Sequence, residues 1–349
     1  MFKGIDLSSD TVSRPTPEMK KAMMEAELGD EQRGEDPTTR KLEERLASML
    51  GFSAGLFFPS ATMANEVAIC ALAERGDELL AAENSHLFFA ETGGPAVHAN
   101  VMCRPIPTQT GIFSADAVKQ AYRAMKGIHL PLSKILSIEN TTNIGGGIPW
   151  STTQLTAIVS IAKELNLKLH MDGARFFNAN VKTELAPAEI AKGFDTVTIC
   201  LTKGLGCPVG AVLVFDQSLY PKIRRLKQLM GGAMRQSGIL AAAGIYALDH
   251  HIRRLREDHH NAGILAKLLS EAISPIHVLN NPPETNIVLF EWQSNKITAE
   301  MFLKICLDKG VRFSQIGPKL LRAVTYLNIW REDIYKAVNI VREICRELK

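Results

Sequence analysis

The sequence predicts an α/β fold in which a mostly parallel sheet is covered by helices on both faces, followed by a smaller α+β domain. Short runs rich in Val, Ile and Leu alternate with helical patterns up to about residue 249, as buried parallel strands do. Beyond residue 250 the strands and helices become fewer and shorter. A chain of 349 residues can form one large and one smaller domain. We therefore expect an arm at 1–15, a large domain at 16–249 and a small domain at 250–349.

The composition is that of an ordinary globular protein, with 46% hydrophobic and 22% charged residues. The net charge is +3 and both signs are interspersed, so we expect no nucleic-acid or membrane partner. The six cysteines form no C-x-x-C pair, and we predict no metal. The chain start lacks an apolar signal core and no window reaches transmembrane length, which predicts a cytoplasmic protein.

The first elements follow from capping residues and apolar spacing. Residues 1–15 contain Gly, Ser and Pro residues that favour an extended arm. A proline after Thr16 begins a helix that should reach Leu28. Thr38 or Thr39 should cap a second helix, whose leucines recur every fourth position on one face.

A strand at about 54–58 runs into a turn of small residues and then a long apolar helix to about residue 73. This order of elements offers free backbone N–H groups to a phosphate. Those groups belong to Ser60, Ala61 and Thr62. A simple helix cap is the alternative interpretation of the turn.

The most informative stretch is Asp195–Val214, in which a Gly-rich turn carrying Lys203 joins two β-branched strands. The glycines allow close backbone approach to a ligand, and partial desolvation makes the lysine amine nucleophilic. Upstream, the strand pattern LKLHM ends in Asp172. Both side chains follow strand carboxyl ends, where open parallel sheets bind ligands. A carboxylate for a pyridine nitrogen and a lysine in Schiff-base range of an aldehyde are what pyridoxal phosphate (PLP) requires.

Other strand ends should bring further groups to the same edge. A strand at 78–82 precedes His86, which either lies over a flat cofactor ring or fills a core corner. A surface helix is expected at 114–126, and His129 then precedes a buried strand at 135–139. The loop after that strand, 140–147, lies on the predicted rim with Asp172 and Lys203.

The remaining elements are predicted from the same signals. A long helix opening at Gly231 would bring Arg235 towards an anion site. The C-terminal part should contain a strand at 286–292, an amphipathic helix near 298–309 and a final helix from Arg331.

Several motifs together resemble those of the low-specificity L-threonine aldolases. They are DLSSDTVSRPTPEM, GEDPTT, PSATMAN, SIEN, LHMDGARFFNA, TICLTKGLGCPVGAVLV, GGAMRQSGILAAAGIYAL and REDHHNA. The match extends from about residue 6 to 265, and RAVTYL echoes a family arginine motif beyond it. The resemblance implies PLP fold type I, like aspartate aminotransferase, with a seven-stranded sheet. It also implies a homotetramer of two dimers that cleaves L-threonine, L-allo-threonine or a related β-hydroxy-α-amino acid to glycine and an aldehyde.

The resemblance further implies roles for individual residues. Lys203 would bind PLP covalently, Asp172 would bind its ring nitrogen and His86 would stack on the ring. The residues implied to hold the cofactor are Ser60, Ala61, Thr62, His86, Asp172, Arg175, Lys203 and Arg235. Those implied to bind the substrate carboxylate are Ser9, Arg175 and Arg322. His129 corresponds to a histidine near the substrate hydroxyl, so the base is His129, His86 or an ordered water.

The chain departs from the usual family pattern at four positions. Ala61 replaces a glycine and should tighten the phosphate turn. Arg33 replaces a tyrosine, Thr142 a histidine and Tyr326 a histidine. These three changes are expected to reshape the substrate pocket, which leaves the preferred diastereomer open.

Two other functions compete with the aldolase. A β-eliminating lyase on the same scaffold would break the Cα–H bond and release ammonia and a keto acid. A PLP carrier without turnover would not need the arginines for a carboxylate. An NAD-binding site is disfavoured because the glycines of KGLGCPVG have the wrong spacing.

Overall fold

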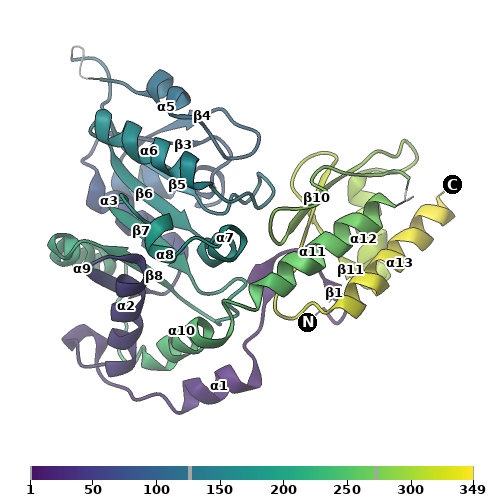
Figure 1. Ribbon diagram of the computed structural model, residues 1–349, viewed down its shortest axis with the longest axis horizontal. Helices are drawn as coiled ribbons and strands as arrows, with labels where there is room; N and C mark the ends of the chain where they lie inside the picture. Colours follow the sequence, from purple (N-terminus) through teal and green to yellow (C-terminus); the bar gives the residue numbers. More distant parts are fainter. Residues whose placement is uncertain (1, 125–127, 272–273, 349) are drawn as a thin grey trace.

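A seven-stranded sheet forms the centre of the larger part of the molecule (Figure 1). The computed structural model describes residues 2–124, 128–271 and 274–348. The strand order is β2-β8-β7-β6-β5-β3-β4, and β8 alone runs antiparallel to both of its neighbours. The strands are β2 (Ala54–Phe58), β3 (Glu78–Ala82), β4 (Met102–Ile106), β5 (Ser133–Glu139), β6 (Lys168–Gly173), β7 (Thr196–Cys200) and β8 (Ala211–Phe215). The predicted mostly parallel, seven-stranded sheet is confirmed.

The register of this sheet brings the ends of neighbouring strands to one edge. Phe58 of β2 and Cys200 of β7 both pair with Ala211, the first residue of β8. Asp172 of β6 pairs with Glu139 of β5. The loops that follow β2, β5, β6 and β7 therefore leave the sheet at the same edge, as the parallel arrangement predicts.

Helices cover both faces of the sheet because β2, β3, β7 and β8 are buried along their whole length. Their apolar side chains belong to three clusters: one under α2, α6 and α10, one under α3 and α9, and a smaller one that contains Leu79 of β3 and Ile69 of α3. The helices of this part are α1 (Pro17–Met24), α2 (Pro37–Leu50), α3 (Ala61–Leu72), α4 (His86–Phe89), α5 (Ala115–Ala121), α6 (Thr152–Glu164), α7 (Phe176–Thr183), α8 (Pro187–Ile190), α9 (Tyr220–Leu229) and α10 (Gly238–His250).

Three predicted helix boundaries were wrong. α1 ends at Met24, four residues early, because Met24 and Leu28 are exposed and offer nothing to bury beyond that turn. α2 is capped by Asp36, whose Oδ1 accepts from Thr39 N–H at 2.8 Å, so the predicted threonine caps lie inside the helix. α10 begins at Gly238 and not at Gly231.

The surface helix expected at 114–126 is shorter in the structure. α5 spans Ala115–Ala121, and Ser114 caps it by accepting from the Ala117 N–H group. Part of the expected range, residues 125–127, lies outside the described residues.

A smaller antiparallel sheet, ordered β12-β13-β10-β9, forms the C-terminal part. Its strands are β9 (Ile276–Val278), β10 (Ile287–Trp292), β12 (Ser314–Gln315) and β13 (Leu320–Val324), packed with α11 (Leu255–Ser270), α12 (Ala299–Asp308) and α13 (Arg331–Glu347). The predicted strand near 286–292 and the last two helices are confirmed. The domain boundary at residue 250 stays a prediction.

The N-terminal arm belongs in space to this smaller part. β1 (Ile5–Asp6) pairs in parallel with β11 (Val311–Arg312), and Leu7 lies in the apolar core of the C-terminal part. The chain then passes through a 3₁₀ turn, η1 (Asp10–Val12), to α1 under the large sheet (Figure 1). The arm therefore joins the two parts of the molecule.

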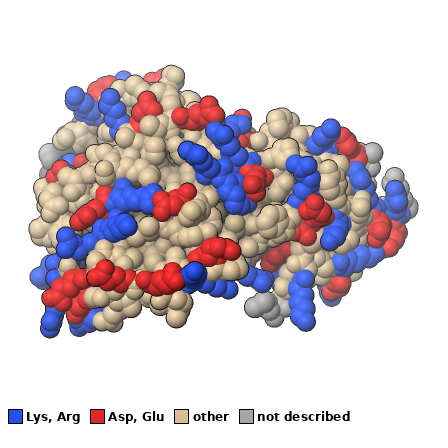
Figure 2. All heavy atoms as spheres, turned by 60° about the horizontal axis from the view of Figure 1, so that its bottom comes forward, with Lys and Arg blue, Asp and Glu red and all other residues tan. Residues whose placement is uncertain are grey.

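Charges of both signs alternate on the face shown in Figure 2, without a continuous basic or acidic field. Within the described residues, no helix is long and apolar enough to cross a membrane.

Candidate active site

Lys203 lies in the loop that follows β7 at the shared edge of the sheet. This loop is closed by backbone hydrogen bonds from Leu201 to Gly210 and from Gly206 to Lys203. Ser13 of the arm donates to the Lys203 carbonyl at 2.8 Å. The lysine Nζ lies 3.8 Å from Cys200 Sγ, so the amine has no ion pair with a carboxylate in the described chain. The local fold holds the lysine backbone firmly and leaves its amine available.

Asp172 ends β6 in a buried position, with 2% of its surface exposed. Its Oδ1 accepts from Ala174 N–H at 3.0 Å, and its Oδ2 accepts from Asn65 Nδ2 at 3.1 Å. Asn65 is oriented in turn by His170 at 3.1 Å. Burial lowers the pKa of His170 to about 4, so this imidazole is neutral and donates to Asn65 Oδ1. These contacts fix the carboxylate in one orientation.

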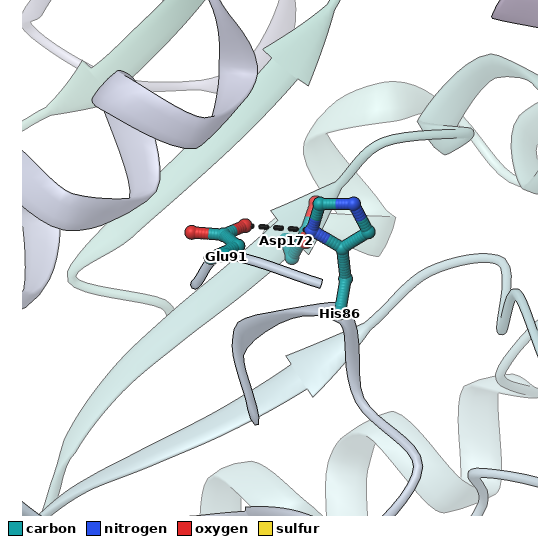
Figure 3. A group of neighbouring side chains, drawn as sticks. All are labelled: His86, Glu91 and Asp172. Carbon is teal, nitrogen blue, oxygen red and sulfur yellow. Dashed lines mark hydrogen bonds and ion pairs between the residues drawn. The ribbon is translucent and has the colours of Figure 1, made fainter. Parts of the chain in front are cut away.

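His86 opens α4 and points towards Asp172 and Glu91 (Figure 3). Its Nδ1 is 2.7 Å from Glu91 Oε1, and this hydrogen bond raises the pKa of His86 against the opposing effect of burial. The ligand atoms of the three side chains lie within 4.8 Å of one another. That spacing suits a metal ion, but His86 and Glu91 already bind each other.

The turn at Ser60–Thr62 forms the N-terminus of α3, as predicted. Ser60 Oγ accepts from Met63 N–H at 3.1 Å, which is the simple helix cap that the sequence also allowed. The first-turn N–H groups of a helix have no intrahelical acceptors and favour an anion. Capping and phosphate binding are therefore compatible at this turn. Arg235, in contrast, is 60% exposed and donates to Asp30 at 2.8 Å, so its phosphate role stays a prediction.

Arg175 forms a buried, two-pronged ion pair with Asp10 of the arm. Its Nε and Nη2 donate to the two carboxylate oxygens at 2.7 and 2.8 Å. Asn286 adds a third hydrogen bond to Asp10 at 3.2 Å. Burial acts to raise the pKa of Asp10, but Arg175, Lys203 and Asn286 together hold it below its usual value. Asp10 thus binds the Nε and Nη2 atoms of Arg175, and the Nη1 atom lies near Asn143.

Arg322 of β13 reaches the same region from the smaller sheet. Its Nη1 donates to Asn143 Oδ1 at 2.6 Å, and Arg175 Nη1 approaches the same oxygen at 3.4 Å. The Arg322 Nε is buried and has no partner within the described chain. Burial and the charge of Arg175 lower the pKa of Arg322 to about 10. Two guanidinium groups therefore converge on one acceptor oxygen, which is the geometry that a substrate carboxylate needs.

Two further predicted residues are placed differently. Ser9 lies in the arm beside Ser8, whose carbonyl accepts from Arg322, and its Oγ caps η1 by accepting from Thr11 N–H. His129 is exposed and precedes β5, at the opposite edge of the sheet from Asp172. Seven residues of strand separate the two edges, which corresponds to roughly 20 Å. Within one chain, His129 does not join the other predicted residues.

The structure also shows the surroundings of Thr142, Tyr326 and Arg33, the three positions at which the chain departs from the family pattern near the expected pocket. Thr142 is fully buried, and its Oγ1 accepts from Ile148 N–H to close the loop after β5. Tyr326 donates to the Asp6 carbonyl at 2.8 Å and anchors the arm. Arg33 is 73% exposed beside Asp30. Among the described residues, no hydrogen bond or ion pair joins any of these three side chains to Lys203, Asp172 or Arg322.

Sequence reasoning missed Asn65, Glu91, Asp10 and Asn143. Each lies inside or beside a motif that was recognised, but none has a spacing that signals its partner. Asp10 and Arg175, for example, are 165 positions apart. Only the folded sheet edge shows that they meet.

Comparison with known proteins identifies relatives over nearly the whole chain. The Beta-eliminating lyase family matches residues 6–295. The low specificity L-threonine aldolase of Escherichia coli K12 is 43% identical, covering 95% of this chain and 96% of its own. Low-specificity L-threonine aldolase 1 of Arabidopsis thaliana is 34% identical, covering 98% and 97%.

Solved structures show the same fold at lower identity. A Leishmania major threonine aldolase has a TM-score of 0.83 and 20% identity, covering 98% of this chain and 99% of its own. A structure described as SPT with PLP has a TM-score of 0.74 and 16% identity, covering 99% and 88%. The predicted fold type I architecture is confirmed.

The side chains at this edge fit PLP. The Lys203 amine has no carboxylate partner, the buried Asp172 carboxylate keeps acceptor capacity, and the α3 N-terminus offers amides at Ser60–Thr62. These groups match an aldehyde, a pyridine nitrogen and a phosphate, respectively. The resemblance found in the sequence is therefore supported by relatives, fold and donor set alike, and the chain belongs to the Beta-eliminating lyase family, among its low-specificity L-threonine aldolases.

Proposed function

We propose that this protein is a PLP-dependent aldolase that cleaves L-threonine, L-allo-threonine or a related β-hydroxy-α-amino acid to glycine and an aldehyde. The observation that carries the proposal is the convergence of Arg175 and Arg322 on one oxygen, at the edge that also holds Lys203 and Asp172. A protein that only stored PLP would have no use for a buried and a partly buried guanidinium group at this edge.

PLP, when bound, supplies an electron sink at the substrate α-carbon. The chain determines which bond at that carbon breaks. Arg322, with its free Nε, binds the substrate carboxylate, and Nη1 of Arg175 adds a second donor. Binding one substituent of the α-carbon in this way fixes the directions of the others, including the bond to the β-carbon. Asp172, held in one orientation by Asn65 and Ala174, would bind the ring nitrogen of the cofactor.

The reaction also needs a base for the proton of the β-hydroxyl group. That base must lie within hydrogen-bond reach, directly or through one water. His86 is the histidine that one chain brings to the site, with Nδ1 bound to Glu91 and Nε2 left for the substrate side. His129 and an ordered water remain the alternatives, and His129 requires a neighbouring chain.

We further propose a cytoplasmic homotetramer, built as a dimer of dimers. The exposed position of His129, far from its own chain's site, supports an assembly in which a neighbour provides this histidine. Sedimentation velocity of the purified protein tests the assembly, and cell fractionation tests the location.

Product identity tests the reaction. The purified protein is incubated separately with L-threonine and L-allo-threonine, and acetaldehyde, glycine, ammonia and keto acid are assayed. Equal amounts of acetaldehyde and glycine are expected, and the two rates give the diastereomer preference. Ammonia with keto acid would instead establish β-elimination, and neither product set from any β-hydroxy amino acid would refute the proposal.

A further inference from the structure

Two buried carboxyl groups meet beside His86. Glu66 of α3 is 3% exposed and Glu91 is 4% exposed. Glu91 Oε1 accepts from His86 Nδ1 at 2.7 Å and from Asn65 Nδ2 at 2.9 Å. Its Oε2 and both oxygens of Glu66 have no partner among the described residues. Gly94, on the turn that carries Glu91, packs against the Glu66 carboxyl group, and the nearby Glu91 carboxylate adds to burial in raising the pKa of Glu66.

The backbone is shaped to admit this second carboxyl group. A Cβ atom on Gly94 would lie 2.1 Å from Glu66 Oε1, so only glycine leaves room for it. The Gly94 N–H group donates to the Glu91 carbonyl at 2.8 Å, which places the turn that carries Glu91 directly over Glu66. The turn that carries Glu91 is thus packed against the Glu66 carboxyl group.

Two ionised carboxylates in contact repel each other unless a cation or a proton lies between them. No lysine or arginine among the described residues binds either oxygen of Glu66. One shared proton gives the unpartnered oxygens a hydrogen bond and removes the repulsion.

We propose that Glu66 and Glu91 hold one proton between them, and that this pair is the positioning device for His86. Glu66 is the donor to Glu91 Oε2, and Glu91 stays an anion whose Oε1 accepts from His86 Nδ1. The imidazole is then fixed in one tautomer, with Nε2 pointing away from Glu91 (Figure 3).

The surroundings of the pair are consistent with this assignment. Burial and then the contact with Glu91 raise the pKa of Glu66 to about 9. The other ionisable groups near Glu66 are Cys70, whose pKa burial raises to about 11, and Cys103, whose pKa burial also raises. Both are neutral thiols at physiological pH. On the side of Glu91, His86 and Asp172 are the facing groups.

The role of His86 rests on the proposed function, but the shared proton does not. Infrared spectroscopy of the PLP-free protein tests the proton alone. The spectrum of the native protein at pH 7.5 minus that of Glu66→Gln should show the carbonyl band of one protonated carboxyl group. The same subtraction with Glu74→Gln, an exposed glutamate just beyond α3, should show none. Absence of the Glu66 band would overturn the proposal, whatever the enzyme's activity.

Kinetics tests the positioning of His86. Glu66→Leu removes the donor to Glu91 and should lower kcat about tenfold with little change in KM. Glu66→Gln restores an N–H donor without a titrating proton, so it should recover most of that loss. We expect kcat of the native enzyme to fall at alkaline pH as Glu66 ionises, and Glu66→Gln should lack this fall. If Glu66→Leu and Glu66→Gln had the same kcat, and kcat fell at alkaline pH in both variants, the positioning role would be refuted.

The two proposals fail in distinguishable ways. A protonated carboxyl band in a protein that releases no aldehyde would support the shared proton and refute the aldolase proposal. Aldehyde release without the band would support the aldolase and refute the shared proton.

Discussion

Removing the carboxylate of Asp10 should destabilise the protein strongly, because Arg175 would then be a buried charge without its partner. Both side chains are essentially inaccessible, with 2% and 0% of their surfaces exposed. Breaking a buried ion pair by removing one member costs about 3–5 kcal/mol. Asp10→Asn keeps an oxygen that can accept from Arg175 and should lose about half of that amount.

The chain offers a matched control in the pair of Asp249 with Arg45. These atoms are also close, at 2.6 Å, but the side chains are 46% and 30% exposed. Exposed pairs contribute about 0–1 kcal/mol, so Asp249→Ala should change the unfolding free energy far less than Asp10→Ala.

Urea unfolding of the PLP-free protein, followed by circular dichroism, measures the three variants against the native chain. The substrate KM provides a second readout, because loss of Asp10 lets the Arg175 guanidinium turn away from Asn143. We expect KM to rise in Asp10→Ala and to stay unchanged in Asp249→Ala. A loss below about 1 kcal/mol in Asp10→Ala, or one equal to that of Asp249→Ala, would refute the argument from burial.

Three other predictions follow from the site. Lys203→Ala should abolish turnover and change the absorption of bound PLP to that of its free aldehyde, while binding through the phosphate stays measurable; near-native turnover would contradict the assignment. Arg322→Ala should raise the amino acid KM at least tenfold and leave PLP affinity within about twofold, as equilibrium dialysis can check, since its free Nε serves the substrate and not the cofactor. His170→Gln should reduce the loss of unfolding free energy between pH 6.5 and pH 4. In the native protein the folded-state pKa of His170 is about 4, below the usual 6.5, so the unfolded state binds the proton first as the pH falls. The native unfolding free energy should therefore fall over this range by at most about 1.4 kcal/mol per pH unit. A native-like slope in that variant's urea midpoints would disprove it.

Much of the sheet was predictable because its signals are local. The strands β7 and β8 carry β-branched runs that can be recognised locally. The end of β7 led to Lys203, and the end of the β6 pattern led to Asp172. Helix boundaries were less predictable where the cap was ambiguous, as between Asp36 and the following threonines.

The contacts of the site were not predictable, because they depend on which strand ends become neighbours. Arg175 could be identified from its motif, but nothing in the sequence shows that Asp10 binds two of its nitrogens. The sequence contained His129 but not its position at the far edge of the sheet. Glu66 lies in an apolar helix pattern, and nothing local shows that it meets Glu91.

The arm has a consequence for how the protein is made. Its residues are synthesised first, yet the groups that receive them come late: Leu7 O accepts from Val324 N–H, and Ile5 pairs with Val311. The hydrogen-bond partners of Asp10, Arg175 and Asn286, are likewise synthesised much later than Asp10 itself. The N-terminal arm must therefore stay undocked until β11 and β13 have been synthesised. A chain terminated before β13 would lack Arg322 and, with it, the proposed contact to the substrate carboxylate.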